Sequence, residues 1–524
     1  MRRRPILALA CGAAAAALVI PALASSPGVR GARAPIACDS SRPAVAHHAS
    51  QVVLAQQPRL RPVPCGGTTG YASAESHIVA LPSGEIAVAP AVLPGGFLGT
   101  DTPPVAVRPN TQSNASPAGL LVTTNAGEHW TFVRPSGATW NPTDHSEYVD
   151  RSTGRLFFED YGPISVAASF GAAQEGPAHI NWSPDGGITW HHGVIASVFM
   201  PENPRFMAAV APAHARKPHG YPNVLYFCAD TNVGFSSPAI VGRLCFRSFD
   251  GGLSWRRAAV LFNGTVPQHH ECRRKGEDYY ANDAQYPQAA RDGSLYVMVT
   301  CAGATYLARS TDEAATFPIV HVGGRPLTIP ADEYSDLQIA PDGTMYVMSK
   351  SGPHLMLRAS ANRGRTWTRA VDVTAPGVVG VMQWTLTVGA HDTLAVSYLG
   401  HRGGQTTWNA FVTATRSAHA LLRPGAGPVF WSVQLNTDDA PLLYGSDIEG
   451  AGQVQTIGGR YRPVPPGLRN SQSIGDEFIG ATLTTDGTPW ASFTTDCGPA
   501  PDTAGCRATN DQTRGYVGYL RWPG

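Results

Sequence analysis

The sequence contains few lysines and few charged residues of either sign. Only Lys217, Lys275 and Lys350 are lysines among 524 residues, and 39 basic side chains stand against 38 acidic ones. A dedicated nucleic-acid-binding protein carries a basic stripe, so this balance argues against nucleic acid as a partner. No Walker, Rossmann or HExxH pattern occurs. We therefore expect no nucleotide chemistry and no cofactor.

Long hydrophobic runs are also lacking, apart from one near the N-terminus. Arg2, Arg3 and Arg4 precede an uncharged, alanine-rich run from Ile6 to Ile20, and small residues follow it. This layout is typical of a secretory signal peptide, and the run is too short for a membrane anchor. We expect residues 1–24 to be the signal peptide, with cleavage after Ala24, and the protein to be secreted without a membrane span.

Paired CxxC motifs are absent, which argues against zinc sites. Eight cysteines remain after Ala24, and an exported chain with an even number favours disulfides. Sequence cannot fix one of the 105 pairings, but the order of the cysteines suggests local bridges 38–65, 228–245, 272–301 and 497–506. The stretch His269–Cys272 has metal-ligand residue types, but a lone cluster is more often merely polar. We predict no metal site.

Glycine and proline make up about a fifth of the chain, and one eight-residue pattern recurs. We call this pattern the octet. Clear copies begin at Thr123, Ser183, Ser248 and Ser360, and a degraded copy begins at Ser310. Each has Asp or Asn at its third position and an aromatic residue at its eighth. Asp or Asn accepts hydrogen bonds from backbone two residues on, and Gly tolerates positive φ, so the octet predicts a hairpin turn covered by its aromatic ring.

The octet resembles the Asp-box, or BNR repeat, of the sialidase superfamily and related β-propellers. The resemblance covers roughly residues 70–520. It implies that the octets are structural and lie on the rim away from the active site. Asp185 and Asp250 are therefore not candidates for catalysis.

A second element alternates with the octets and reads as a strand, a Gly turn and another strand. Its clearest copy runs from Tyr334 to Val347, and the others begin near residues 76, 147, 205, 286, 384 and 478. Seven period-2 hairpins predict an all-β fold, a β-propeller of about seven four-stranded blades, with six as the alternative. We expect residues 51–524 to form this single domain, after a flexible leader over 25–50. The strand Gly515–Leu520 is expected to close the ring against the N-terminal region.

Acidic residues are enriched where the chain enters each inner strand. In a propeller these entries surround the central channel on one face. The expected catalytic residues are Tyr334, Glu333, Asp336, Asp144, Glu147 and Asp283, and the expected substrate-binding residues are His77, Arg205, Tyr286, Trp384 and Glu477. Glycoside hydrolysis usually needs two carboxyl groups, and sialidases substitute a Tyr nucleophile.

The stretch Glu333-Tyr334-Ser335-Asp336-Leu337 resembles the segment that carries the nucleophilic Tyr of sialidases. The resemblance implies that Tyr334 attacks the sugar, that Glu277 or Asp283 removes its proton, and that Asp144 or Glu147 is the acid/base. The structural alternative is that Tyr334 simply begins an inner strand.

One departure concerns the three arginines that hold the substrate carboxylate in sialidases. The first of them has no counterpart, because His77-Ile78-Val79 stands in its place. A neutral sugar fits this chain better than sialic acid. We therefore predict a secreted propeller that recognises glycans and hydrolyses them as an exo-glycosidase. The alternative is a non-catalytic propeller that binds glycans or proteins, and a calcium-dependent adhesin is a third interpretation. The oligomeric state is not predicted.

Overall fold

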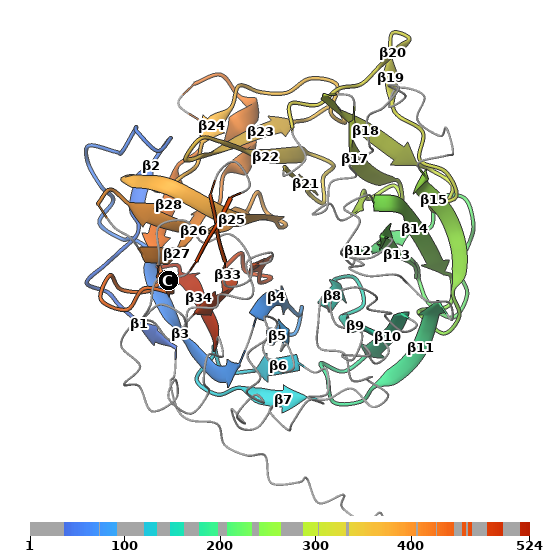
Figure 1. Cartoon of the computed structure of the whole chain (residues 1–524), viewed down its shortest axis with the longest axis horizontal. Coiled ribbons are helices and arrows are strands. Elements are labelled where there is room, and N and C mark those ends of the chain that lie inside the picture. The colour runs from blue at the N-terminus through green and yellow to red at the C-terminus, as the bar shows by residue number, and fades with distance from the viewer. Residues whose placement is uncertain are drawn as a thin grey trace, which may run out of the picture. The chain divides into compact units, whose positions relative to one another are not determined.

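Seven antiparallel β-sheets follow one another around a ring in the computed structural model of the chain (Figure 1). The structure describes residues 36–72, 74–91, 120–133, 147–161, 178–196, 207–232, 240–263, 287–301, 303–331, 335–404, 407–425, 427–444, 453–456, 460–463, 479–495 and 514–523. All of them belong to the unit Gly31–Gly524. Each sheet is one blade, so the protein is an all-β, seven-bladed propeller, as predicted.

The first three blades each have four strands in chain order from the channel outward. Blade 1 contains β4 (Ala74–Ala80), β5 (Ile86–Ala91), β6 (Leu120–Thr123) and β7 (Thr131–Val133). Blade 2 contains β8 (Glu147–Asp150), β9 (Arg155–Tyr161), β10 (Ala178–Ser183) and β11 (His191–Ala196). Blade 3 contains β12 (Met207–Pro212), β13 (Asn223–Asn232), β14 (Ile240–Ser248) and β15 (Arg256–Asn263).

The next two blades differ in their outer strand. Blade 4 contains β16 (Gln288–Ala289), β17 (Leu295–Cys301) and β18 (Ala304–Ser310), and a bridge from Ala308 to Ile319 stands where a fourth strand would pair. The hairpin of β19 (His321–Val322) and β20 (Arg325–Pro326) follows it. Blade 5 contains β21 (Asp336–Ile339), β22 (Met345–Ser351), β23 (His354–Ser360) and β24 (Val371–Asp372).

The last two blades include strands from the N-terminal region. Blade 6 contains β25 (Val378–Val388), β26 (Leu394–Arg402), β27 (Thr407–Thr415) and β28 (Phe430–Gln434), with β2 (Val45–His47) added outside and β29 (Leu443–Tyr444) paired to β27. Blade 7 contains β32 (Gly480–Leu483), β33 (Pro489–Thr495), β34 (Arg514–Arg521), β3 (Val63–Ala72) and β1 (Ala37–Cys38). The pairing of β34 with β3 closes the ring, as expected (Figure 1).

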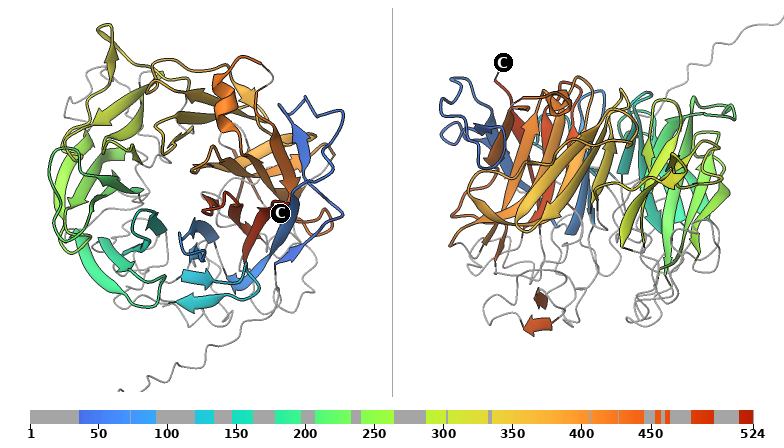
Figure 2. Two further views of the ribbon diagram at one scale, coloured as in Figure 1. Left: turned by 180° about the vertical axis from the view of Figure 1, so that it is seen from behind. Right: turned by 90° about the horizontal axis from the view of Figure 1, so that it is seen from above.

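Two further elements lie outside the blades. A separate hairpin is formed by β30 (Gln453–Thr456) and β31 (Arg460–Pro463), and a 3₁₀ turn, η2, spans Ala418–Leu422. In side view the blade strands run along the ring axis (Figure 2). No helix of the described residues is long and apolar enough to cross a membrane.

The octets connect the third strand of a blade to its outer edge, and their polar side chains fix the turn. In the second copy, Ser183 Oγ donates to Asp185 Oδ1 (2.8 Å) and accepts from the Gly187 N–H (2.7 Å). Asp185 Oδ1 also accepts from the Thr189 N–H at 2.8 Å. The other copies repeat this pattern, the degraded one included. The prediction that the N–H two residues on donates to the Asp or Asn was wrong. The donor is four residues on, because the N–H two residues on donates to the Ser or Thr hydroxyl that begins the octet.

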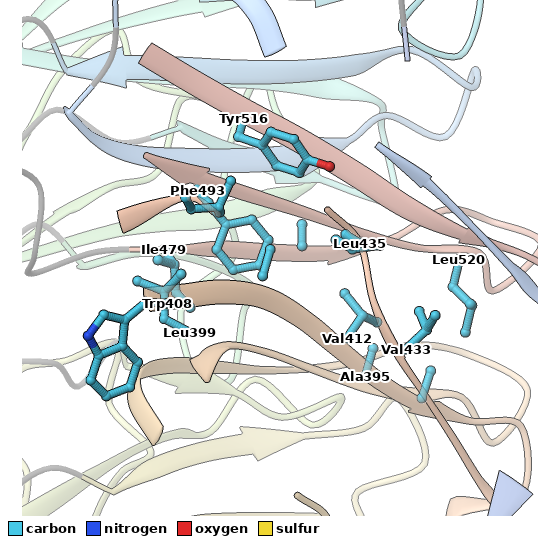
Figure 3. Close-up of a cluster of buried hydrophobic side chains, with 14 of the residues drawn as sticks. Ala395, Leu399, Trp408, Val412, Val433, Leu435, Ile479, Phe493, Tyr516 and Leu520 are labelled. Carbon is cyan, nitrogen blue, oxygen red and sulfur yellow. The ribbon is translucent and has the colours of Figure 1, made fainter. Parts of the chain in front are cut away.

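The hydrophobic core lies between neighbouring blades. Alternate residues of each strand face the preceding or the following blade, as the period-2 pattern predicts. One such cluster joins blades 6 and 7 and includes Trp408, Ile479, Phe493 and Tyr516 (Figure 3). Because each cluster is shared by two blades, no blade buries its apolar faces alone.

Two of the predicted disulfides are present, Cys38–Cys65 and Cys228–Cys245. Each joins residues that lie directly opposite each other on paired strands. The other two predicted pairs, like the predicted signal peptide, involve residues outside the described part. Within the expected leader, β1 and β2 pair with blades 7 and 6, so the paired part of the propeller begins upstream of residue 51.

Candidate functional site

Four of the eleven predicted site residues belong to the described part of the chain, and all four lie on inner strands. They are Asp336 on β21, Trp384 on β25, His77 on β4 and Glu147 on β8. The other seven lie outside the described residues: Tyr334, Glu333, Asp144, Asp283, Arg205, Tyr286 and Glu477. The four fall into two groups, one at the junction of blades 5 and 6 and one at the junction of blades 1 and 2.

At the junction of blades 5 and 6, Asp336 is the first residue of the inner strand and points toward blade 6. Its neighbour Leu337 packs in the cluster between blades 4 and 5, so alternation turns Asp336 the other way. Asp336 Oδ2 accepts from the Leu386 N–H of β25 at 2.8 Å, and Oδ1 accepts from Gln338 Nε2 at 3.1 Å. The carboxyl group is therefore hydrogen-bonded to the backbone of β25, the inner strand of blade 6.

The environment of the Asp336 carboxyl group raises its pKa. The side chain is only partly exposed, and burial raises the pKa of Asp336 to about 6, although the hydrogen bonds from Leu386 and Gln338 act to lower it. A carboxyl group with a pKa near 6 is present in both protonation states in weakly acidic solution. Such a group can give a proton and take it back, which general acid–base catalysis requires.

Trp384 and Lys350 lie at the same junction. Trp384 is partly buried against the cluster of blades 5 and 6. Lys350 is two residues beyond Met348 on β22, so it shares the face of Met348, which packs in that same cluster. The Lys350 Nζ lies 5.8 Å from the centre of the Trp384 ring. Lys350 was not among the predicted site residues, although the alternation in the hairpin from Tyr334 to Val347 extends to it.

A β-bulge at Gln383 sets the direction of Trp384. The register of β25 against β26 shifts between Met382 and Trp384, and Gln383 has φ +43°. Met382 packs between blades 6 and 7, whereas Trp384 packs between blades 5 and 6. Without the bulge, residues two apart would face the same side. Nothing in the sequence around Gln383 signals this bulge.

At the junction of blades 1 and 2, Glu147 is buried. The side chain is 7% exposed, and Oε1 accepts from the Ala89 N–H of β5 at 3.3 Å. Oε2 has no hydrogen-bond partner within the described residues. Burial holds the pKa of Glu147 well above its usual range, and the nearby Glu159 carboxyl adds to the effect. The raised pKa favours the protonated acid, and the burial of Glu147 favours a structural role.

His77 belongs to the same junction. It pairs with Ala89 across β4 and β5 and is partly exposed. Val79, two residues on, packs against the cluster of blades 1 and 2, so His77 faces blade 2. In the described part of the chain, no group of three or more His, Cys, Asp or Glu side chains is arranged to hold a metal ion.

Comparison with known proteins shows similarity in fold. No family model matches the chain, and no curated protein matches it in sequence. The NanB sialidase of Streptococcus pneumoniae is 10% identical, with 94% of each chain covered and a TM-score of 0.38. The alpha-L-arabinanase of Penicillium chrysogenum complexed with arabinobiose is 14% identical (70% of this chain, 93% of that chain, TM-score 0.36). The fucose-specific lectin of Aleuria aurantia is 11% identical (70% and 96%, TM-score 0.37).

Proposed function

We propose that this propeller recognises glycans at the channel ends of its inner strands and hydrolyses a glycosidic bond there. The observation that supports the proposal is the placement of Asp336. It is a partly exposed acid at the start of an inner strand, held by Leu386 of the next blade, with its pKa raised to about 6 by burial. Trp384 at the same junction offers an apolar face to a sugar ring.

The reaction would proceed in two displacements. Tyr334 loses its phenolic proton to Glu277 or Asp283, and its oxygen forms a bond to the anomeric carbon. The bond from that carbon to the leaving oxygen breaks, and this oxygen takes a proton from the Asp336 carboxylic acid. Water then gives a proton to the Asp336 carboxylate and attacks the anomeric carbon, and Tyr334 leaves with the proton that it first gave up. Asp144, expected as an acid/base, is the alternative donor.

A non-catalytic glycan-binding protein is the second candidate. The partly exposed Trp384 favours it, because indole stacking on a sugar needs no carboxyl group. His77, Arg205, Tyr286 and Glu477 would then bind sugar hydroxyl groups. Both candidates fit a secreted protein, since Cys38–Cys65 and Cys228–Cys245 suit an oxidising compartment and residues 1–24 read as a signal peptide.

Sugar release from a panel of aryl glycosides, sialosides included, tests the proposal. The variants are Tyr334→Phe and Asp336→Asn, and Tyr306→Phe, on the third strand of blade 4, is the matched control. Hydrolysis that is lost in both site variants and kept in the control supports the two-displacement reaction. Hydrolysis that survives Tyr334→Phe but not Asp336→Asn moves the chemistry to paired carboxyl groups. If the protein releases no sugar but binds glycans, the result supports the second candidate function.

A further inference from the structure

The sixth residue of the octet can be compared across blades 1 to 5, because each of these blades has one octet with the same turn. In chain order this residue is Glu128, Ile188, Leu253, Ala315 and Arg365. Ile188 is 83% exposed and Leu253 is 68% exposed, and they belong to the neighbouring blades 2 and 3. Because the same turn forms with Glu128 and with Arg365, it does not require an aliphatic residue at this position. The two side chains are therefore available for a contact outside the chain.

Packing between blades 2 and 3 brings a further apolar side chain beside Leu253. Strand β11 follows the octet of blade 2, and its Gly193 lies against the octet of blade 3, where an added Cβ would collide with the Gly252 carbonyl oxygen. Leu253 follows Gly252, and Val194, which is 45% exposed, follows Gly193. An isolated exposed aliphatic residue needs no explanation, but these side chains gather where two blades meet.

Basic residues are concentrated in the same part of the ring. The described residues of blade 3, 207–232 and 240–263, include six Arg or Lys and two Asp, which gives 6 − 2 = +4. The same count for blade 4, over 287–301 and 303–331, gives three basic and three acidic residues. Four of the six basic side chains of blade 3 are exposed: Arg216, Lys217, Arg256 and Arg257. In the described part of the chain, none of these four forms an ion pair.

The exposed basic residues lie next to the octet of blade 3. The Arg216 guanidinium is 4.7 Å from the centre of the Phe249 ring, which belongs to that octet, and Arg256 follows its last residue. The loop that carries Arg216 and Lys217 is fixed at two points. The Arg216 N–H donates to Glu313 Oε1 at 3.0 Å, and the His219 N–H donates to the Phe249 carbonyl oxygen at 2.9 Å. The loop therefore holds its charges beside the exposed Leu253.

This surface lies at the end of the ring opposite to Asp336. Successive strands of a blade are antiparallel, so the first and third strands run in the same direction. The octets follow the third strands, whereas Asp336 is the first residue of an inner strand. Contact at the octet end therefore leaves the starts of the inner strands accessible.

We infer that the octet end of blades 2 and 3 docks on a bilayer that contains anionic phospholipid. We call this surface the docking patch, and it consists of Ile188, Leu253, Arg216, Lys217, Arg256 and Arg257. The two aliphatic side chains enter the boundary between headgroups and acyl chains, and the basic groups contact lipid phosphates. A soluble polyanion would satisfy the basic groups but would leave Ile188 and Leu253 in water, so the exposed aliphatic residues favour a bilayer.

Flotation of the full chain with lipid vesicles tests the inference. We expect binding to be about 100-fold tighter to phosphatidylcholine vesicles with about one third phosphatidylglycerol than to phosphatidylcholine alone, and to weaken as salt is added. Ile188→Ser combined with Leu253→Ser should weaken binding to the anionic vesicles about tenfold or more, because two apolar side chains no longer leave water. Arg256→Gln combined with Arg257→Gln should also weaken it about tenfold or more.

Two matched controls remove the same kinds of side chain elsewhere. Val322→Ser removes a side chain that is 43% exposed on the hairpin of blade 4, and Arg365→Gln removes a charge at the sixth octet position of blade 5. Neither should change vesicle binding. Thermal unfolding checks that each variant is folded, and the exposure of the substituted side chains predicts unchanged stability.

The inference is independent of the proposed function, and the outcomes separate the two. A wild type that does not bind the anionic vesicles, or binding that neither double variant weakens, overturns the docking patch. Loss of binding only in the arginine variant, together with equally tight binding to dextran sulfate, also overturns it and indicates a soluble polyanion as the partner. Release of sugar from a soluble aryl glycoside should be equal in the wild type and all variants, so either proposal can fail while the other stands.

Discussion

The junction of blades 5 and 6 and the junction of blades 1 and 2 each place a carboxyl group between two blades. Asp336 and Glu147 both accept a hydrogen bond from a backbone N–H of the neighbouring blade. Water reaches Asp336 in part, whereas Glu147 is 7% exposed. Burial raises both pKa values, to about 6 for Asp336 and well above the usual range for Glu147. A hydrogen bond of the same kind thus holds a half-buried acid at one junction and a buried acid at the other.

The largest difference between the two junctions is expected in the rate of sugar release. Asp336→Asn should lower the rate of sugar release about 100-fold or more, because a positioned general acid contributes about 10²–10⁴-fold. Glu147→Gln should change it less than about threefold, because the amide keeps the shape of the side chain and an acceptor for the Ala89 N–H. Initial rates at saturating substrate measure both. Equal losses in the two variants would remove the distinction between the junctions.

The next largest effect is expected in the stability of the buried junction. Glu147→Ala removes the acceptor of the Ala89 N–H and leaves a cavity, so we expect a loss of about 2–4 kcal/mol in the free energy of unfolding. Glu147→Gln keeps the acceptor and should stay within about 1 kcal/mol of the wild type. Denaturant unfolding at pH 7 gives both values. An alanine variant as stable as the wild type would show that the bond to Ala89 contributes nothing.

A smaller effect concerns the pH dependence of stability at Asp336. Its folded pKa is raised above the unfolded value, so its contribution is fully present below about pH 4 and is lost as the pH rises through about 6. Asp336→Asn stays neutral, so it should be more stable than the wild type by about 3 kcal/mol at pH 7.5 and should show little gain at pH 4.

His47 titrates in the same range with the opposite sign, because burial lowers its pKa to about 4. His47 is present in the wild type and in Asp336→Asn, so its contribution cancels in the difference between their free energies of unfolding. A gain in Asp336→Asn that is equal at pH 4 and pH 7.5 would contradict the raised pKa.

The smallest effect is expected from the bulge. Gln383→Gly relieves the positive φ and removes the buried amide, and we expect a gain of about 0.5–1 kcal/mol in stability. Thermal unfolding of the variant and the wild type measures this difference. A variant that is less stable would show that Gln383 holds the junction together by a contact of its own.

The repeats made the fold predictable from the sequence. Each octet carries its own hydrogen-bond donors and acceptors, so local chemistry alone fixes the turn between strands. The degraded copy is instructive, because Glu313 and Ala314 occupy positive-φ positions there. Glu313 Oε1 accepts from the N–H groups of His214, Ala215 and Arg216 in the preceding blade, blade 3. That tertiary contact offsets the lost glycines, and no local pattern reveals it.

The candidate site was predictable only in part. Position at the start of a predicted hairpin is enough to select Asp336 and Trp384. The partial exposure of Asp336 and the burial of Glu147 depend on how two blades pack, and the two residues look alike in sequence. The direction of Trp384 depends on the bulge at Gln383, which is a tertiary feature of β25.

The closure of the ring by β3 and β34 has a consequence for how the chain folds. Cys38 and Tyr519 are in contact although they are 481 positions apart, so blade 7 assembles only when both ends of the described chain have emerged. Contacts of such sequence separation give a high contact order, and proteins of that kind fold slowly. Until closure, the faces of blades 1 and 6 that later pack on blade 7 remain open to solvent. An exported chain would spend that interval exposed to aggregation and proteolysis.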